Sequence, residues 1–177
     1  MKPINIILCA LFAALSAVLS QAGFTIGVIP INLTHVSVFL AAGLLGARRG
    51  AISQLVFVLL GAFGVPVFSG MSGGLSHIAG PTGGFIIGYI LCAFMTGFII
   101  DRYGTSVKVL VAAMLAGWAA TYIPGIAWFM IQMQTGIAAT LSMCVWPYMP
   151  GDLAKTVLCV VLIVRLRPLV RKATQEA

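Results

Sequence analysis

The chain has 177 residues, of which 61% are hydrophobic and 7% are charged, and its formal net charge is +7. Soluble domains carry about 25% charged residues, so this composition excludes an ordinary soluble globular protein. The basic residues lie in small clusters between long uncharged segments, which favours membrane topology signals over a nucleic-acid-binding surface.

The uncharged segments set the number of predicted membrane helices. Residues 3–47, 50–100 and 109–151 contain no Lys, Arg, Asp or Glu. One span needs about 20 apolar residues, so each segment has the length of two spans with a connector. We therefore predict an all-α integral membrane protein that forms a single transmembrane domain over residues 1–177. Its six transmembrane helices are expected at about 4–22, 31–47, 50–66, 83–100, 107–124 and 151–166.

The basic clusters predict the orientation of these helices. If every segment between clusters crosses the membrane twice, nine of the ten Lys and Arg residues face the cytoplasm and both termini are cytoplasmic. Residues 1–22 also resemble a secretory signal peptide, because Lys2 precedes an apolar stretch and Ser20 to Ala22 is similar to a cleavage site. We favour a first membrane helix, since no soluble mature domain follows.

Alanines repeat along the first predicted helix in two Ala-x-x-x-Ala patterns on adjoining faces. They are Ala10, Ala13, Ala14 and Ala17. Small residues at this spacing let two helices approach closely in lipid. The spacing alone leaves two interpretations open, which are internal packing and a docking face for another subunit.

The second predicted helix opens with the polar residues Asn32, Thr34 and His35. These side chains could line a cavity at the outer end of the bundle, or they could satisfy backbone groups there. Neither His35 nor His77, the second histidine, has acidic or cysteine neighbours at ligand spacing. We therefore predict no metal site, and the four scattered cysteines are expected to be buried free thiols.

Glycine is concentrated in the connection between the third and fourth predicted helices. Nine of the chain's 20 glycines lie between Gly61 and Gly88. Irregular backbone at membrane depth is tolerated only where protein buries it or a cavity lies beside it, so this segment is interpreted as a lid over a pocket, with an ordinary exterior loop as the alternative.

The chain has no GK[ST] phosphate-binding pattern, which excludes an ATPase. The apolar connection 125–150 is expected to lie against the membrane or to prolong the fifth helix.

Two opposite charges, Asp152 and Lys155, stand at the start of the last apolar segment. If Arg165 marks the cytoplasmic edge, they lie about 20 and 15 Å above it, well inside a hydrocarbon core of about 30 Å. A charge at the bilayer centre costs roughly 2.5–3.5 kcal/mol and usually marks a substrate or ion path. Residues three apart share a helix face, so both side chains are expected to point into the bundle. The alternative is a structural ion pair that fastens two helices.

Four sequence features together resemble one family across nearly the whole chain and in the right order. They are the alanine pattern of the first helix, PVFSG at 66–70, GPTGGFIIGY at 80–89 and PGDLAK at 150–155. The chain is similar to BioY, the biotin-binding S component of energy-coupling factor (ECF) transporters.

This resemblance implies a function and a set of partners. It implies a substrate-binding subunit, not an enzyme, that captures biotin on the outer side of the prokaryotic cell membrane and binds no cofactor of its own. Its partners would be a transmembrane coupling protein and two cytoplasmic ATPases that use ATP. The resemblance also assigns the first-helix alanines to the contact with the coupling protein, Asp152 and Lys155 to the biotin pocket, and the glycine-rich connection to the lid.

The chemistry of biotin suits this assignment. Its ureido ring carries two N–H donors and a carbonyl acceptor, and its tail ends in a carboxylate; aspartate can accept from N–H and lysine can donate to either oxygen group. No arginine within a predicted span could clamp the carboxylate with two hydrogen bonds, so the remaining polar contacts are expected from Lys155, Tyr89, Thr34, Asn32 or the backbone amides of the lid. Two alternatives stay open: an S component for another small vitamin, and a non-transporting membrane protein with a structural ion pair.

Overall fold

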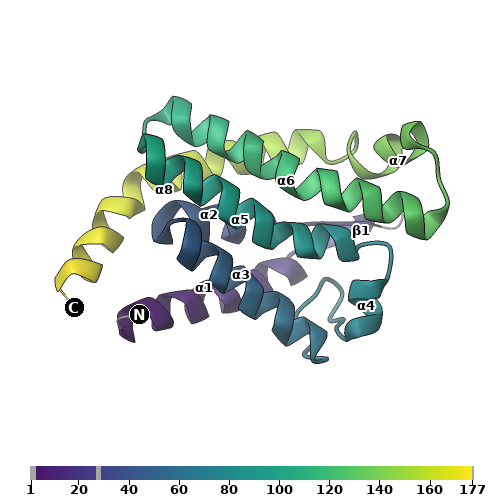
Figure 1. Cartoon of the computed structure of the whole chain (residues 1–177), viewed down its shortest axis with the longest axis horizontal. Helices are drawn as coiled ribbons and strands as arrows, with labels where there is room; N and C mark the ends of the chain where they lie inside the picture. Colours follow the sequence, from purple (N-terminus) through teal and green to yellow (C-terminus); the bar gives the residue numbers. More distant parts are fainter. Residues whose placement is uncertain (1–2, 27–28, 177) are drawn as a thin grey trace.

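The protein is a bundle of long helices whose two termini lie at the same end (Figure 1). The structure, a computed structural model, describes residues 3–26 and 29–176. These residues form eight helices and two short strands. The long helices are α1 (Pro3–Gln21), α2 (Thr34–Leu45), α3 (Ala47–Ala62), α5 (Gly83–Tyr103), α6 (Val107–Met133) and α8 (Met149–Glu176). The short elements are β1 (Gly23–Ile26), β2 (Ile29–Asn32), α4 (Leu75–Ala79) and α7 (Ile137–Cys144).

The helix bounds differ from the sequence prediction at several ends, and the third helix occupies Ala47–Ala62 where residues 50–66 were predicted. The second helix begins at Thr34 instead of residue 31, because β2 pairs with β1 in an antiparallel hairpin that was not predicted. The fifth helix continues past Pro124 to Met133, and a separate short helix, α7, follows it. The sixth continues beyond residue 166 to Glu176. Residues 27–28, in the predicted first connection, and Lys2, one of the orienting basic residues, lie outside the described residues.

The surface and length of the helices identify an integral membrane protein. By length and composition, α1, α5 and α6 can each cross a membrane. Their outward side chains are large and apolar, among them Ile7, Phe98 and Ile123. A helix that is apolar all round is stable only when it is buried in protein or lipid. The four cysteines are free and buried, as predicted.

The core is built around α2, in which eleven of twelve residues are buried. This helix packs against α1, α3, α5 and α8. Where α1, α2 and α3 meet, Ser16 Oγ lies 2.8 Å from Ser37 Oγ and donates to Gln54 Oε1 at 3.1 Å. All three side chains are fully buried. Hydrogen bonds of this kind join helices in lipid, where the hydrophobic effect does not.

At the end that carries the termini, one carboxylate joins three helices. Asp101, near the end of α5, accepts a hydrogen bond from the Ala47 backbone N–H at 2.8 Å and pairs with Arg167 of α8 at 3.1 Å. The first residues of a helix have unpaired N–H groups, so the carboxylate caps α3. The connection from α2 to α3 turns at Gly46, whose φ of +84° favours glycine. A Cβ there would also lie 2.6 Å from the Asp101 carboxylate.

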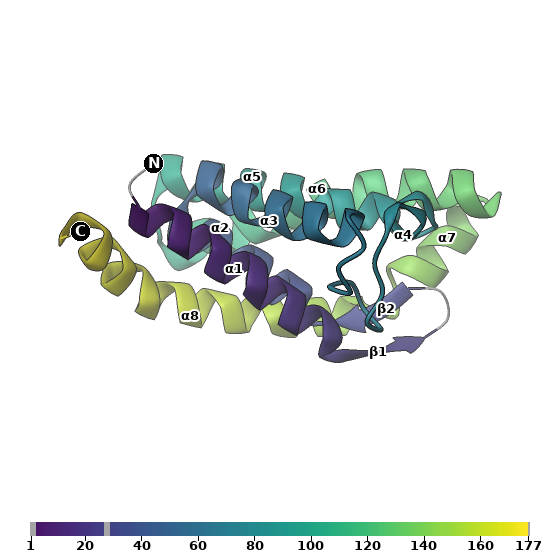
Figure 2. The same ribbon diagram turned by 90° about the horizontal axis from the view of Figure 1, so that it is seen from below.

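The opposite end holds the irregular structure. Figure 2 shows the β1–β2 hairpin, α4, α7 and the connection between α3 and α4 at the end far from the termini. This connection, residues 63–74, folds into a narrow turn in which Phe68 and Ser72 pair through their backbones.

Candidate ligand-binding site

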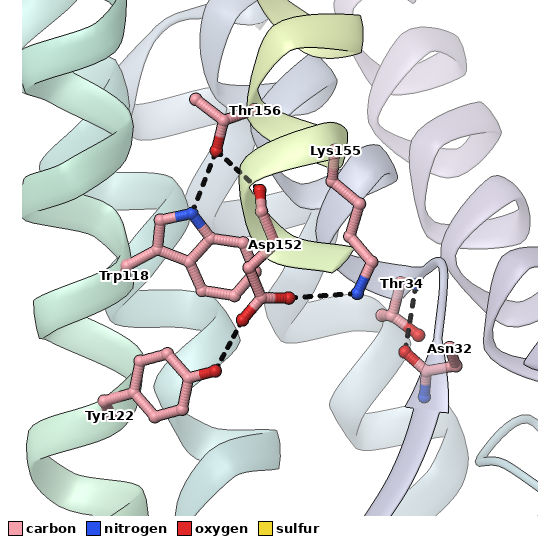
Figure 3. Close-up of polar contacts among 7 residues, drawn as sticks. All are labelled: Asn32, Thr34, Trp118, Tyr122, Asp152, Lys155 and Thr156. Carbon is pink, nitrogen blue, oxygen red and sulfur yellow. Dashed lines mark hydrogen bonds and ion pairs between the residues drawn. The ribbon is translucent and has the colours of Figure 1, made fainter. Parts of the chain in front are cut away.

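The site begins with the first turn of α8 (Figure 3). Pro150 stands within this turn, where its missing N–H costs no hydrogen bond. Lys155 Nζ lies 3.1 Å from Asp152 Oδ1, and the two residues are only 8% and 7% exposed. The pair therefore points into the protein from one face of the helix, as predicted from the spacing.

Helix α6 supplies the partners that hold this turn in place. The Tyr122 hydroxyl donates to Asp152 Oδ2 at 2.5 Å. The Trp118 indole N–H donates to Thr156 Oγ1 at 3.1 Å, and Thr156 in turn donates to the Asp152 carbonyl at 2.9 Å. Tyr122 and Lys155 thus bond to different oxygens of the Asp152 carboxylate. Since a carboxylate oxygen can accept two hydrogen bonds, Asp152 retains acceptor capacity for a ligand.

The facing wall comes from the start of α2 and from α5. Asn32 Oδ1 accepts from the Thr34 backbone N–H at 3.1 Å, and its amide donates to Ser69 Oγ at 2.6 Å. The His35 ring lies 4.1 Å from the Trp118 ring between centroids and 4.9 Å from that of Tyr89, which it meets edge-on. Asn32 thus connects the wall to the 63–74 connection, while His35 faces the aromatic side of α6.

Three adjoining cavities lead toward the ion pair. The innermost, about 40 Å³, lies among His35, Trp118, Tyr122, Asp152 and Lys155. The second, also about 40 Å³, includes Phe57, Ser69, His77 and Thr82, and shares four residues with the first: Pro30, Asn32, Phe85 and Tyr89. The third, about 280 Å³, lies beside Gln21 and Met71 and shares Ser20, Pro30, Asn32 and Ser69 with the second. The shared walls place the cavities in a row from the irregular end to Asp152.

The turn of the 63–74 connection covers this row and is fastened to the end of α1. Gln21 holds it from both sides, because its amide donates to Phe68 O at 2.8 Å and its Oε1 accepts from Met71 N at 2.9 Å. Ser20 donates to Val67 O. We call residues 67–72, which these bonds hold, the lid turn.

The lid turn also packs against side chains of α3 and α4. Phe68 is buried against Phe57, with their ring centroids 5.6 Å apart, and it stacks on His77 at 5.3 Å. Burial lowers the pKa of His77 below its ordinary value. Helix α6 holds the end of α4, because Trp128 and Gln132 donate hydrogen bonds to the carbonyls of Gly80 and Ala79.

The structure brings all five predicted ligand-binding residues together. Asp152, Lys155, Tyr89, Thr34 and Asn32 line the two inner cavities. The prediction missed Trp118 and Tyr122. Their spacing of four residues on one helix face was visible, but nothing in the sequence paired that face with α8.

The four alanines of α1 do not share one environment. Ala10 and Ala14 are exposed, Ala17 is half-buried and Ala13 is buried against the core. The exposed side of α1 therefore presents Ala10 and Ala14, while Ala13 takes part in internal packing. Internal packing is thus confirmed for Ala13, and a docking face at Ala10 and Ala14 stays a prediction.

Comparison with known proteins decides the family. The model of the BioY family matches residues 1–172. The chain belongs to the BioY family. A probable biotin transporter BioY from Pyrococcus horikoshii is 36% identical over 169 residues, which cover 94% of this chain and 98% of that one. The biotin transporter BioY of Thermotoga maritima is 33% identical, over 93% and 96%.

A solved structure of an S-component for biotin has the same fold. The S-component for biotin from an ECF-type ABC transporter matches with a TM-score of 0.86 and 30% identity, over 94% of this chain and 92% of that chain. The family resemblance seen in the sequence motifs is therefore confirmed.

Proposed function

We propose that this chain is the substrate-binding subunit of a biotin uptake transporter in the cytoplasmic membrane of a prokaryotic cell. It captures biotin from the outer side and delivers it with an ATPase-driven ECF module. The observation that carries the proposal is the buried Asp152–Lys155 pair, joined by Tyr122, at the inner end of a row of cavities. A buried ion pair is seldom a net source of stability, whereas intramembrane charges commonly mark a substrate site.

The charges at the inner end also favour one orientation of the ligand. Asp152 would repel the carboxylate of biotin but can accept from a ureido N–H. Lys155 uses one of its three N–H donors on Asp152 and can give another to the ureido oxygen. The valerate tail then extends into the second cavity, where Asn32, Ser69 and Thr82 offer polar groups for the carboxylate.

Direct binding tests this function. Purified protein in lipid nanodiscs is expected to bind radiolabelled biotin at one molecule per chain. Excess unlabelled biotin should displace the label, and other water-soluble vitamins should not. Displacement by a different vitamin would show an S component of another specificity. A folded preparation that binds no vitamin would overturn the proposal in favour of a structural ion pair.

We also propose six membrane spans, α1, α2, α3, α5, α6 and α8, with both termini in the cytoplasm. Support comes from the shared end of the two termini, where α2 passes into α3 and α5 into α6 (Figure 1). Arg48, Arg102 and Lys108 belong to the ends of α3, α5 and α6 at these connections. Basic residues concentrate on the cytoplasmic side of membrane proteins.

Cysteine labelling checks this topology in intact cells. With the four native cysteines replaced, Ser72→Cys is expected to react with an impermeant maleimide and Ser106→Cys is not. The two positions lie at opposite ends of the bundle, in the lid turn and before α6. The reverse labelling pattern would invert the proposed orientation.

The partners are proposed to be a transmembrane coupling protein, which docks on α1, and two ATPases that bind and hydrolyse ATP. The exposed Ala10 and Ala14 permit close helix approach. Ala14→Leu is expected to lower energised uptake severalfold in the full complex while biotin binding stays unchanged. Ala112→Leu, at an exposed position of α6, is the matched control. Equal uptake by the two variants would remove α1 as the docking helix.

A further inference from the structure

One polar group in the innermost cavity has no hydrogen-bond partner in the part of the chain that the structure describes. His35, the second residue of α2, has an Nε2 atom that is buried and makes no hydrogen bond with any of the described residues. Buried polar atoms are nearly always paired, so an unpaired one calls for an explanation. From the sequence, His35 could line a cavity or satisfy backbone groups at the start of α2.

The surroundings of His35 hold its ring in one position. The ring lies against Trp118 with an interplanar angle of 34° and meets Tyr89 edge-on at 86°. Phe39, one turn further along α2, lies 6.1 Å away. The ring is thus fixed by aromatic contacts on several sides, and it lines the same cavity as Asp152 and Lys155.

The donors and acceptors of this cavity leave a place for a second donor. The Asp152 carboxylate can only accept, so it suits the ureido N–H groups, whereas the ureido oxygen has two lone pairs and can accept from two donors. Lys155 supplies one. A neutral imidazole with its proton on Nε2 supplies the other.

We propose that His35 is a specificity-determining ligand-binding residue, which donates from Nε2 to the ureido oxygen of biotin alongside Lys155. The inference rests on the proposed function and on the orientation of biotin given above. It assigns His35 a direct contact with the ligand in addition to its place in the aromatic packing.

An analogue that differs at one atom tests the contact. In 2-thiobiotin, sulfur replaces the ureido oxygen and accepts hydrogen bonds poorly. Dissociation constants for biotin and 2-thiobiotin are measured with the wild type, His35→Phe, His35→Gln and Phe39→Leu. His35→Phe is expected to weaken biotin about tenfold and 2-thiobiotin less than threefold. His35→Gln, which retains an N–H donor, is expected to recover most of the biotin affinity.

The control separates packing from hydrogen bonding. Phe39→Leu disturbs the aromatic packing beside His35 without removing a polar group, so it is expected to change both affinities by the same factor. Gel filtration and thermal unfolding establish that each variant is folded, and His35→Leu replaces His35→Phe if the latter is not.

Each other outcome has a definite meaning. Equal losses for the two ligands in the His35 variants would overturn the inference and leave His35 a packing role only. Unchanged biotin affinity in His35→Phe would overturn it as well, while the proposed function stands. If the wild type binds neither ligand, the proposed function itself fails.

Discussion

The two ends of the bundle are held together by different kinds of interaction. At the end with the termini, helices contact one another directly: Asp101 caps α3 and pairs with Arg167, and α2 passes into α3 through one residue, Gly46. At the opposite end, side chains such as Gln21 bond to the backbone of loops, and cavities lie between the helices.

This difference indicates which end can open. Bonds from a single side chain to a loop can break without disturbing a helix, whereas the Asp101 contacts join the ends of three helices to one another. Binding loops and lids are drawn from the least stable parts of a structure. The irregular end is therefore suited to admit a ligand, while the other end keeps the bundle closed beneath it.

The largest expected effect is at the inner end of the cavities. The double variant Asp152→Asn with Lys155→Met removes the two charge-assisted hydrogen bonds that we propose with biotin, each worth about 1.5–3 kcal/mol. We expect biotin affinity to fall at least a hundredfold, measured by equilibrium binding.

The double variant is preferable to either single variant. Removing one partner of a buried pair destabilises a protein by about 3–5 kcal/mol, which would confuse lost binding with lost folding. The double variant should remain folded and monodisperse. Near-normal biotin affinity in that folded protein would show that the pair is structural.

The second prediction concerns the closed end. Asp101→Ala removes the cap of α3 and the partner of Arg167, and we expect a loss of about 1–2 kcal/mol in stability with biotin affinity unchanged. Thermal unfolding in detergent measures the stability, and equilibrium binding measures the biotin affinity. Asp101→Asn retains an oxygen for the Ala47 N–H and should recover about half of the loss. A fall in biotin affinity would contradict the separation of the two ends.

A smaller effect is expected at the lid turn. Gln21→Ala removes the bonds to Phe68 O and Met71 N, each worth about 0.5–1.5 kcal/mol. Biotin should dissociate roughly tenfold faster, as measured by chasing bound label with unlabelled biotin. Gln134→Ala is the matched control, because the bond that the Gln134 amide donates to Ile131 O stays within its own segment. Equal dissociation rates for the two variants would show that the lid turn does not limit release.

The smallest effect concerns pH. His77 stacks on Phe68, and its pKa is lower in the folded lid than in an unfolded one because burial disfavours the charged ring. The neutral His77 ring stabilises the closed lid turn fully above about pH 6.5. This stabilisation is lost as the pH falls toward the lowered pKa of His77, because the open form binds the proton more readily. We expect biotin dissociation to quicken up to twofold between pH 7.5 and 5.5. His77→Phe should abolish this dependence, and its persistence would assign it to another group.

The sequence predicted the long helices and the charged pair because both depend on local information. The length of their apolar segments predicts α1, α5 and α6. A spacing of three residues places Asp152 and Lys155 on one helix face. The hairpin was missed, although glycine at position 23 and proline at position 30 flank a short apolar stretch. Pairing of its strands competes with helix formation, and apolar content alone does not decide between the two.

The rest of the site depends on contacts between distant segments. Tyr122 lies 30 residues from Asp152, and Gln21 lies 47 residues from Phe68. Such pairs are set by how helices pack, which a single sequence does not reveal. The role of the polar residues before α2 stayed open for the same reason: the same Asn32 amide that bonds to Ser69 would also serve a backbone group in another fold.

The rigidity of α1 gives its attachment to the lid turn a mechanical consequence. The helix is 19 residues long, or about 28 Å from end to end at about 1.5 Å per residue. A rigid rod of that length pivoting by about 10° about one end moves its other end by about 5 Å, which exceeds the length of any hydrogen bond. The lid turn is hydrogen-bonded to the last two residues of α1, Ser20 and Gln21. A modest tilt of α1, imposed along its lipid-facing side, therefore displaces the lid turn without any change inside the helix.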